Sequence, residues 1–378
     1  MSSKKEIKAT SDLGDVYLGR GLNKRQKRRK KSLLSVNTRS ICVDKVNSLV
    51  DLVDAFKDMS VQARRVGQCA AVYENMLKDK ARPTVFLGLA GPLIAGGLRQ
   101  VIRDMIYYGI VDVVVSTGAI LYQDLYLALG NKMYKGSPEA DDSILRDHLI
   151  NRIYDTYVDD EKFVRTDAWI SRFAGSLSPR PYSSREFLSI LGDKLDDDSS
   201  ILKTASRFDV PVFSPAINDS SIGIGLTDHY YVKDKLKLPR LSIDSIRDNF
   251  ELTQIMVRSK KTAAVYVAGG VPKNFINDSV VMGYIFGKNT GGHSYAFQVT
   301  TDVPHWGGLS GSTLEEAKSW GKVSKKAYKA MAFVEPTVSL PIIAGYVVKK
   351  KCWKDRRRLS IVWKNDKLKE LSLGDKVK

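Results

Sequence analysis

Six short apolar runs rich in β-branched residues recur between residues 80 and 345, and each ends in small or polar residues. Continuous apolar runs of this length are typical of strands buried on both faces of a parallel sheet. Amphipathic helical patterns fall between them, for example at 93–108 and 243–257. The alternation predicts an α/β fold with a doubly wound, mostly parallel sheet. The six runs are 84–87, 111–115, 210–213, 263–267, 295–299 and 332–334.

The residues that follow the predicted strands are suited to binding a nucleotide. In open α/β sheets, ligands bind outside the carboxyl ends of the strands. Gly, Ser, Thr, Asp or Glu stands near each of these ends. Small residues there let backbone N–H groups approach phosphates, and acidic residues can hold ribose hydroxyls. No clean GxGxxG motif is present, but looser Gly-rich turns at 88–93 and 268–272 support a nucleotide-type site.

The net charge of +18 is concentrated at the two ends of the chain. Residues 1–32 carry 11 Lys and Arg against 3 Asp and Glu, and residues 349–378 carry 12 against 4. A like-charge run such as 24–31 favours a disordered segment or a fraying helix. It could tether a polyanion, although a solubilising tail is the simpler interpretation. We therefore divide the chain into a basic tail at 1–35, a catalytic domain at 36–348 and a basic extension at 349–378.

Three further segments carry weaker patterns. Apolar residues recur at helical spacing within 41–80, which predicts helices packed onto the sheet before its first strand. The polar, Asp-rich stretch 130–200 predicts helices and ordered loop that cover the site. In the C-terminal extension, 360–363 predicts a single strand.

Cysteine, histidine and hydropathy patterns argue against several classes of protein. The longest mostly apolar stretch, 84–98, is shorter than the ~20 residues of a membrane span, and no secretory signal is evident. The cysteines lack CxxC spacing, which favours reduced thiols in a cytoplasm, and the histidines lack paired spacing, so we expect no metal site. These residues are Cys42, Cys69, Cys352, His148, His229, His293 and His305.

Lys322 is the strongest candidate for covalent chemistry. It lies in the run Ala317–Val323, with Trp320 two residues before it and Gly321 immediately before it. An aromatic neighbour can desolvate the amine, and a flexible glycine can leave a path for an incoming carbon. A neutral lysine attacks carbonyls or imines to form a Schiff base. Taken alone, such a run is more often an ordinary surface turn.

Three ordered blocks of the sequence resemble the deoxyhypusine synthase family. They are SGSTLEEAKSWGKV, which ends just after Lys322, PVFSPAINDSSIG and AGGVPK. The resemblance covers about residues 40–347, nearly all of the expected globular body. The block TTDVPHWGGL and the departures described below are similar to the bacterial deoxyhypusine synthase-like branch.

This resemblance implies a Rossmann-like subunit in a homotetramer, with active sites at dimer interfaces and NAD as a redox catalyst. In the family's reaction, NAD takes a hydride from spermidine to give an imine. The catalytic lysine, which corresponds to Lys322, attacks this imine; 1,3-diaminopropane leaves and a butylamine group stays on the lysine. A lysine of an acceptor protein then takes the group, and NADH returns the hydride.

The resemblance also implies which residues contact NAD. The matching positions are Thr117, Gly118, Asp219, Gly269, Gly270, Thr301, Ser310 and Glu335. Glu335 replaces an Asp that the family uses against the ribose, a change of one methylene. Gly91 and Pro92 replace a Ser-Asn pair, so two polar contacts are missing there.

The positions that bind the polyamine depart further from the family. Trp320 and Lys322 are retained, but Ile224 and Leu309 stand where the family has carboxylates. A buried ammonium needs a paired anion, so these two residues cannot replace the lost contacts. Three more positions are candidates for substrate binding. Where the family has Glu, His and Asn, this chain has Gln123, Asn274 and Asp278 respectively.

The residues therefore favour a transferase with altered substrate recognition. The leading interpretation is an NAD-dependent enzyme that moves an aminoalkyl group from a polyamine through a Lys322 imine to a protein lysine or a small amine. Polyamine synthesis of the homospermidine synthase type is one alternative. A non-catalytic scaffold that binds RNA or a ribosome through its basic ends is another.

Overall fold

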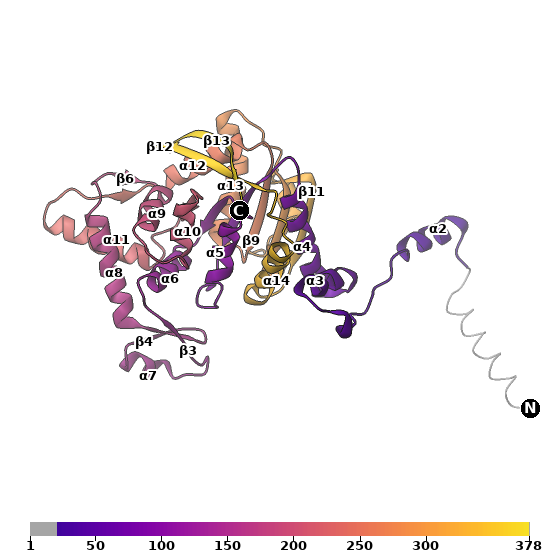
Figure 1. The fold of residues 1–378 in the computed structure, drawn as a ribbon, viewed down its shortest axis with the longest axis horizontal. Helices are drawn as coiled ribbons and strands as arrows, with labels where there is room; N and C mark the ends of the chain where they lie inside the picture. Colours follow the sequence, from indigo (N-terminus) through magenta and orange to yellow (C-terminus); the bar gives the residue numbers. More distant parts are fainter. Residues whose placement is uncertain (1–20, 378) are drawn as a thin grey trace, which may run out of the picture. The chain divides into compact units, whose positions relative to one another are not determined.

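The computed structural model describes residues 21–377. Two compact units divide the chain, residues 1–41 and residues 42–378. The larger unit (Figure 1) is built on a six-stranded parallel sheet. The strand order is β11-β10-β9-β1-β2-β7, which confirms the predicted fold class. The strands are β1 (Thr84–Leu89), β2 (Val113–Ser116), β7 (Val212–Phe213), β9 (Thr262–Val267), β10 (His293–Val299) and β11 (Val323–Ala332).

The strand order determines where a ligand can bind. From β1 the chain moves outward through β2 to β7, and then crosses to the other side of β1 to build β9, β10 and β11. The connections therefore diverge between β1 and β9, and a crevice opens at the carboxyl ends of these two strands. Every residue of β1 and β9 is buried, as expected for central strands covered on both faces.

Five of the six apolar runs coincide closely with strands, and the last is displaced. The sequence pattern predicts a strand at 332–334, whereas β11 covers Val323–Ala332. This strand forms the edge of the sheet, and its exposed Lys325 and Lys326 interrupt the apolar pattern. Lysines on an edge strand also discourage pairing with another chain.

Helices on both faces of the sheet form two cores. Alternate residues of β1 point to opposite faces: Val85, Leu87 and Leu89 belong to one core and Phe86 to the other. The first core includes α3, α4, α5 and α14, and the second includes α12 and α13. The bounds are α3 (Leu49–Asp58), α4 (Val61–Lys78), α5 (Arg99–Tyr107), α12 (Ser245–Arg258), α13 (Gly270–Val281) and α14 (Pro336–Lys349).

The polar stretch 130–200 contains the expected helices and a small antiparallel sheet that the sequence pattern does not reveal. Its strands have the order β3-β5-β4 and are only three or four residues long. The elements here are β3 (Met133–Lys135), α7 (Asp142–Asp147), β4 (Ile150–Ile153), β5 (Thr156–Asp159), α8 (Asp160–Gly175), β6 (Pro181–Tyr182) and α9 (Ser184–Asp193), and α10 (Ile201–Arg207) follows directly. Beside them lie α6 (Gly118–Ala128), α11 (Ser221–Lys235) and β8 (Ser242–Ile243).

The C-terminal extension forms a hairpin that packs into the larger unit. Where the sequence predicts one strand, the structure has β12 (Arg357–Lys364) paired antiparallel with β13 (Lys367–Lys376). The buried Arg356 precedes the hairpin and donates to Asp112 Oδ2 at 2.7 Å and to Gly109 O at 3.0 Å. Arg82 donates to the same carboxylate at 2.6 Å. Two arginines and one buried Asp therefore anchor the extension to the segments that directly precede β1 and β2.

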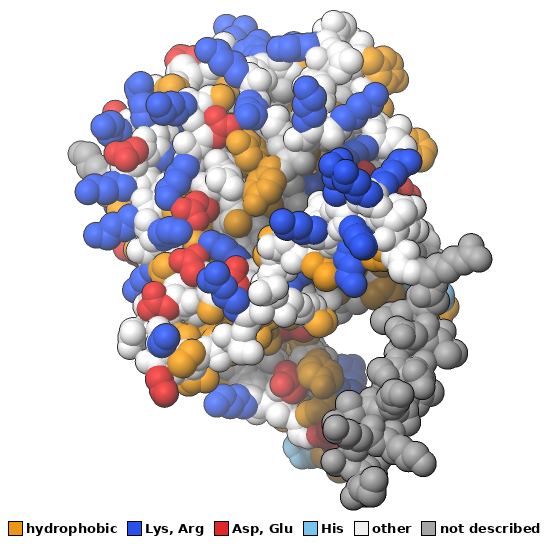
Figure 2. Space-filling view, turned by 90° about the vertical axis from the view of Figure 1, so that its right-hand side faces the viewer, with side chains coloured by type: hydrophobic (Ala, Val, Ile, Leu, Met, Phe, Trp, Pro, Cys, Tyr) orange, Lys and Arg blue, Asp and Glu red, His pale blue; other side chains and the backbone are white. Residues whose placement is uncertain are grey.

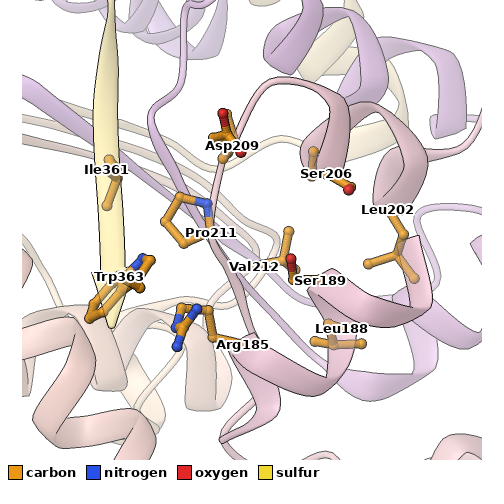
Figure 3. A pocket seen from close by; sticks show the side chains of 12 residues that line it. Arg185, Leu188, Ser189, Leu202, Ser206, Asp209, Pro211, Val212, Ile361 and Trp363 are labelled. Atoms are coloured by element: carbon orange, nitrogen blue, oxygen red, sulfur yellow. The ribbon is translucent and has the colours of Figure 1, made fainter. Parts of the chain in front are cut away.

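Strand β12 also lies across from the short edge strand β7. Figure 3 shows Ile361 and Trp363 of β12 facing Pro211 and Val212 across a small cavity of about 70 Å³. The Arg185 guanidinium lies 4.2 Å from the centre of the Trp363 ring and is neutralised by Glu251 at 2.6 Å. Side chains of the hairpin therefore lie across this cavity from the edge strand β7.

The smaller unit contains one described helix, α2 (Lys24–Leu33), with the sequence KRQKRRKKSL. Asn23 and Gln26 form a capping box at its start, and no residue of the helix is buried. Residues 1–20 of the predicted tail lie outside the described residues. On the face of the molecule in Figure 2, Lys and Arg side chains are more widespread than Asp and Glu. Within residues 21–377, no helix is long and apolar enough to cross a membrane.

We predict that Arg356→Met destabilises the protein by about 3 kcal/mol, because it leaves the buried Asp112 with one cation instead of two. Urea denaturation would measure the free energy of unfolding. Lys354→Met is the matched control, since Lys354 is exposed in the same turn and should change stability by less than about 0.5 kcal/mol. Equal effects of the two substitutions would contradict the anchoring role.

The same cluster predicts a dependence of stability on pH. Burial acts to raise the pKa of Asp112, but Arg82 and Arg356 outweigh it and hold this pKa below its ordinary value. The ionised carboxylate therefore stabilises the fold above pH ~4, and this contribution is lost as the pH falls through the lowered pKa. Stability curves of wild type and Asp112→Asn should converge at acidic pH. Parallel curves would contradict the prediction.

Candidate active site

Lys322 lies directly before β11 and contacts helix α13. Its Nζ is 3.1 Å from Asp278 Oδ1 and 3.4 Å from Asn274 Oδ1. Asn274 and Asp278 are one helical turn apart, and Asn274 Nδ2 donates to Asp278 Oδ2 at 2.9 Å. The Lys322 side chain is 16% exposed. The structure therefore brings together three of the predicted site residues around one amine, with a carboxylate as its nearest partner.

Trp320 lies beside this amine but does not bury it. The Lys322 Nζ is 5.4 Å from the centre of the indole ring, within the range of a cation–π contact. Between the two residues, Gly321 adopts a left-handed conformation with φ +68°, which favours glycine. Trp320 itself is 67% exposed, and the polar contacts of the amine are with Asp278 and Asn274 of α13.

A second lysine at the site, Lys273, was not singled out by the sequence. Its side chain is 2% exposed, and its Nζ donates to the carbonyl oxygens of Leu309, Ser310 and Ser312 at 2.7–3.3 Å and to Ser312 Oγ at 3.0 Å. Burial lowers the pKa of Lys273 to about 8, and the nearby Lys322 acts in the same direction. The only sequence signal was its position after the AGGVP turn, where a lysine is unremarkable.

The turn between β9 and α13 packs closely against the loop that carries Ser310. Ser310 Oγ accepts a hydrogen bond from Gly270 N at 2.8 Å. A Cβ on Gly269 would lie 2.5 Å from Ser310 Cα, so the close approach requires glycine there. Gln298 Nε2 donates to both Ala268 O and Ser310 O at 2.7 Å. Gly269, Gly270 and Ser310 are therefore adjacent, whereas Thr301 is exposed just after β10.

Thr117, Gly118 and Asp219 gather at the neighbouring strand ends. Thr117 N donates to Leu89 O at 3.1 Å, which places the end of β2 against the end of β1. A Cβ on Gly118 would lie 2.3 Å from Ser220 Oγ, so the loop containing Asp219 closes on the start of α6. The Asp219 side chain is exposed there. These three residues lie at the carboxyl edge of the sheet, as the sequence predicts.

Glu335 lines a cavity at this edge of the sheet. Its Oε2 accepts from Thr337 N at 2.8 Å and caps helix α14. The cavity has a volume of about 610 Å³ and is also lined by Pro92, Gly96, Tyr134 and Tyr154. The small antiparallel sheet thus forms one wall, consistent with a covering role for 130–200. Among the predicted cofactor residues, Glu335 lines this cavity and the others lie outside its lining.

The remaining substrate candidates offer no carboxylate. Gln123 is buried, and its Oε1 accepts from Ala95 N at 3.2 Å, which ties it to the turn after β1. Ile224 and Leu309 are 58% and 45% exposed. The acidic side chain that contacts Lys322 is that of Asp278. Within residues 21–377, no group of three His, Cys, Asp or Glu side chains could hold a metal ion.

Comparison with known proteins agrees with these features. The family model described as Deoxyhypusine synthase matches residues 51–347. The "Probable deoxyhypusine synthase 2" of Methanosarcina acetivorans is 44% identical over 313 residues, covering 82% of this chain and 89% of that protein. The "Deoxyhypusine synthase-like protein" of Chlorobaculum tepidum is 44% identical over 316 residues, covering 82% of this chain and 89% of that protein.

The fold is also similar to a solved structure. A protein from Entamoeba histolytica assigned as a deoxyhypusine synthase superposes with a TM-score of 0.56 at 16% identity. The match covers 82% of this chain and 95% of that one, which supports the fold. From the family match and the curated relatives, the chain belongs to the deoxyhypusine synthase family.

Proposed function

We propose that this protein is an NAD-dependent transferase that moves an aminoalkyl group from a polyamine by way of an imine on Lys322. The observation that carries the proposal is the contact between the Lys322 amine and the Asp278–Asn274 pair of α13. It supports a nucleophile whose proton has a nearby acceptor. A surface turn, the ordinary alternative, would leave this side chain in solvent.

The chemistry assigns separate roles to the chain's own residues. When bound, NAD would accept the hydride removed from the polyamine and later return it. Lys322 must lose its proton before attack, and Asp278 is the nearest group that can accept it. Asn274 holds the Asp278 carboxylate in place through its amide. Attack on the substrate imine expels the leaving amine, and an acceptor amine then releases the group from Lys322.

Lys273 is a less suitable nucleophile than Lys322, although its lowered pKa would favour a neutral amine. Its Nζ is surrounded by four oxygen acceptors and closed off from solvent. For Lys273 to attack a substrate, these hydrogen bonds would have to break. The buried carbonyl groups would then have no donor. We therefore assign Lys273 to holding the loop and Lys322 to the covalent step.

The residues at the strand ends fit NAD in part. Gly269 and Gly270 begin α13, where a helix N-terminus favours phosphate, although Ser310 packs on Gly269 and its Oγ accepts from Gly270 N. Glu335 lines an adjoining cavity, although its carboxylate also caps α14. Pro92 in the same cavity has no N–H to donate. We propose that NAD is held through Thr117, Gly118, Asp219, Gly269, Gly270, Thr301, Ser310 and Glu335.

Substrate recognition should differ from that of relatives that bind spermidine through several carboxylates. Exposed Ile224 and Leu309 cannot pair with ammonium groups, and Gln123 is already bonded to Ala95. Asp278 then supplies the acidic contact next to the nucleophile. We propose a polyamine or related amine donor with fewer charged contacts. The acceptor is a protein lysine or, as in homospermidine synthesis, a small amine.

Exposed apolar side chains near the site fit assembly into a homotetramer. Trp306 is 81% exposed, and Trp320, Ile224 and Leu309 are also exposed. Large apolar side chains clustered in exposed positions mark interaction surfaces. A second copy that covers Trp320 would add to the shielding of the adjacent Lys322, as active sites at subunit interfaces require.

A scaffold that binds RNA is the second candidate, because α2 is basic around its whole circumference. Seven of its ten residues are Lys or Arg, and none is acidic. Such a helix attracts phosphates, and binding that depends on it should weaken steeply with salt. If the protein is such a scaffold, no imine should form on Lys322.

Borohydride trapping tests the nucleophile. With NAD and a polyamine donor present, reduction should place the added mass on Lys322 in peptide maps. Lys322→Arg should abolish the adduct, because the guanidinium stays protonated. Lys318→Arg is the matched control: it lies in the same loop, paired with Glu315, and should retain the adduct. An adduct on Lys273, or none with any of a panel of di- and polyamines, would contradict the assignment.

Glu335 tests the cofactor site. Glu335→Ser keeps a good helix cap but removes the carboxylate, so NAD affinity should fall by about 1–3 kcal/mol without loss of folding. Glu335→Asp should bind NAD nearly as well as wild type. Calorimetric titration would measure both. If Glu335→Ser binds NAD as tightly as wild type, the carboxylate does not contact the cofactor.

A further inference from the structure

A second cavity lies at the amino ends of the sheet strands, opposite the edge that carries the cofactor positions. It has a volume of about 410 Å³, within the roughly 300–1,000 Å³ typical of small-molecule pockets. Thr84 at the start of β1 and Ser259 before β9 form its floor, and the hairpin β12–β13 forms another wall. The hairpin packs beside α12 (Figure 1).

Four basic side chains line this cavity, and three of them have no acidic partner among residues 21–377. The four are Lys80, Arg82, Arg258 and Lys260, and no Asp or Glu belongs to the lining. Arg82 is neutralised by Asp112 at 2.6 Å. Within residues 21–377, the other three make no ion pair or side-chain hydrogen bond. By contrast, the adjacent Lys261 pairs with Asp79 at 2.6 Å.

Three unpaired cations around one cavity produce a local positive potential that favours a multiply charged anion. Each ammonium or guanidinium can donate charge-assisted hydrogen bonds to phosphate oxygens. The hairpin adds apolar surface through Leu359, Leu371 and the exposed Leu373. A purely inorganic anion would make no favourable contact with this apolar wall.

The cavity depends on a part of the chain outside the family model. That model ends at residue 347, whereas β12 and β13 begin at Arg357 and Lys367. The lining also shares no residue with the cavity around Glu335. A ligand here would therefore not compete with NAD.

We propose that this cavity binds a small molecule carrying two or more phosphate charges and an apolar portion, as a nucleoside polyphosphate does. The phosphates contact Lys80, Arg258 and Lys260, and the apolar portion lies against the leucines of the hairpin. The ligand bridges the sheet and the hairpin, so its binding stabilises the C-terminal extension on the body.

Calorimetric titration of the full chain, saturated with NAD, tests the proposal with inorganic triphosphate and ATP as probes. The double variant Arg258→Gln/Lys260→Gln should weaken both probes by at least about tenfold. The control Lys325→Gln/Lys326→Gln removes the same charge from the exposed edge strand β11 and should change affinity by less than about twofold. The basic N-terminal run is identical in all three proteins.

The substitution Leu373→Ser tests the contact of the apolar portion of the ligand separately from the contacts of its phosphates. It should weaken ATP severalfold and leave triphosphate unchanged, because only ATP has a portion that reaches the apolar wall. Equal losses in both double variants would show general attraction by the basic surface and overturn the proposal. It would also be overturned if neither probe binds saturably, or if a 12-nucleotide RNA binds through Arg258 and Lys260 while both probes do not.

Discussion

The buried Lys273 holds the two halves of the candidate active site together. It belongs to α13, which also presents Asn274 and Asp278, and its amine binds the carbonyl groups of the loop 309–312. That loop places Ser310 on the Gly269–Gly270 turn and leads on to Lys322. A buried cation is stable only when its donors are satisfied, so the loop has little freedom to move away from the helix. The geometry around Lys322 therefore depends on a lysine that takes no part in the proposed covalent step.

How much of the structure the sequence predicts depends on burial. Central strands such as β1 and β9 are buried on both faces, so their apolar runs are continuous and easily recognised. The edge strand β11, the short strands β3–β5 and the hairpin mix exposed and buried positions, and their patterns are weak. Lys322, Asn274 and Asp278, which the resemblance assigns to one site, lie together in the structure. Lys273 escaped notice because its importance comes from acceptors almost forty residues away in the chain.

Charge balance distinguishes the proposed covalent step at Lys322 from the proposed recognition of the substrate. Asp278 places one carboxylate within hydrogen-bonding distance of Lys322, the proposed nucleophile. A polyamine needs further anions at its other nitrogen atoms, and Ile224 and Leu309 do not provide them. The residues for the covalent step lie on α13 and the loop before β11, whereas Ile224 lies on α11. Substitutions on α11 can thus alter recognition without disturbing the contacts of Lys322.

The C-terminal hairpin lies at the amino edge of the sheet, away from the residues around Lys322. Its attachment rests on Arg356 and Asp112, a buried pair that adds no residue to the carboxyl edge. The attached hairpin lines a small cavity together with Val212 of β7, and a basic cavity at the amino ends of β1 and β9. Because the central strands are rigid and buried, events at one edge need not reach the other through local contacts. A fold of this kind can therefore gain a binding site from an appended hairpin while the residues of the older site stay in place.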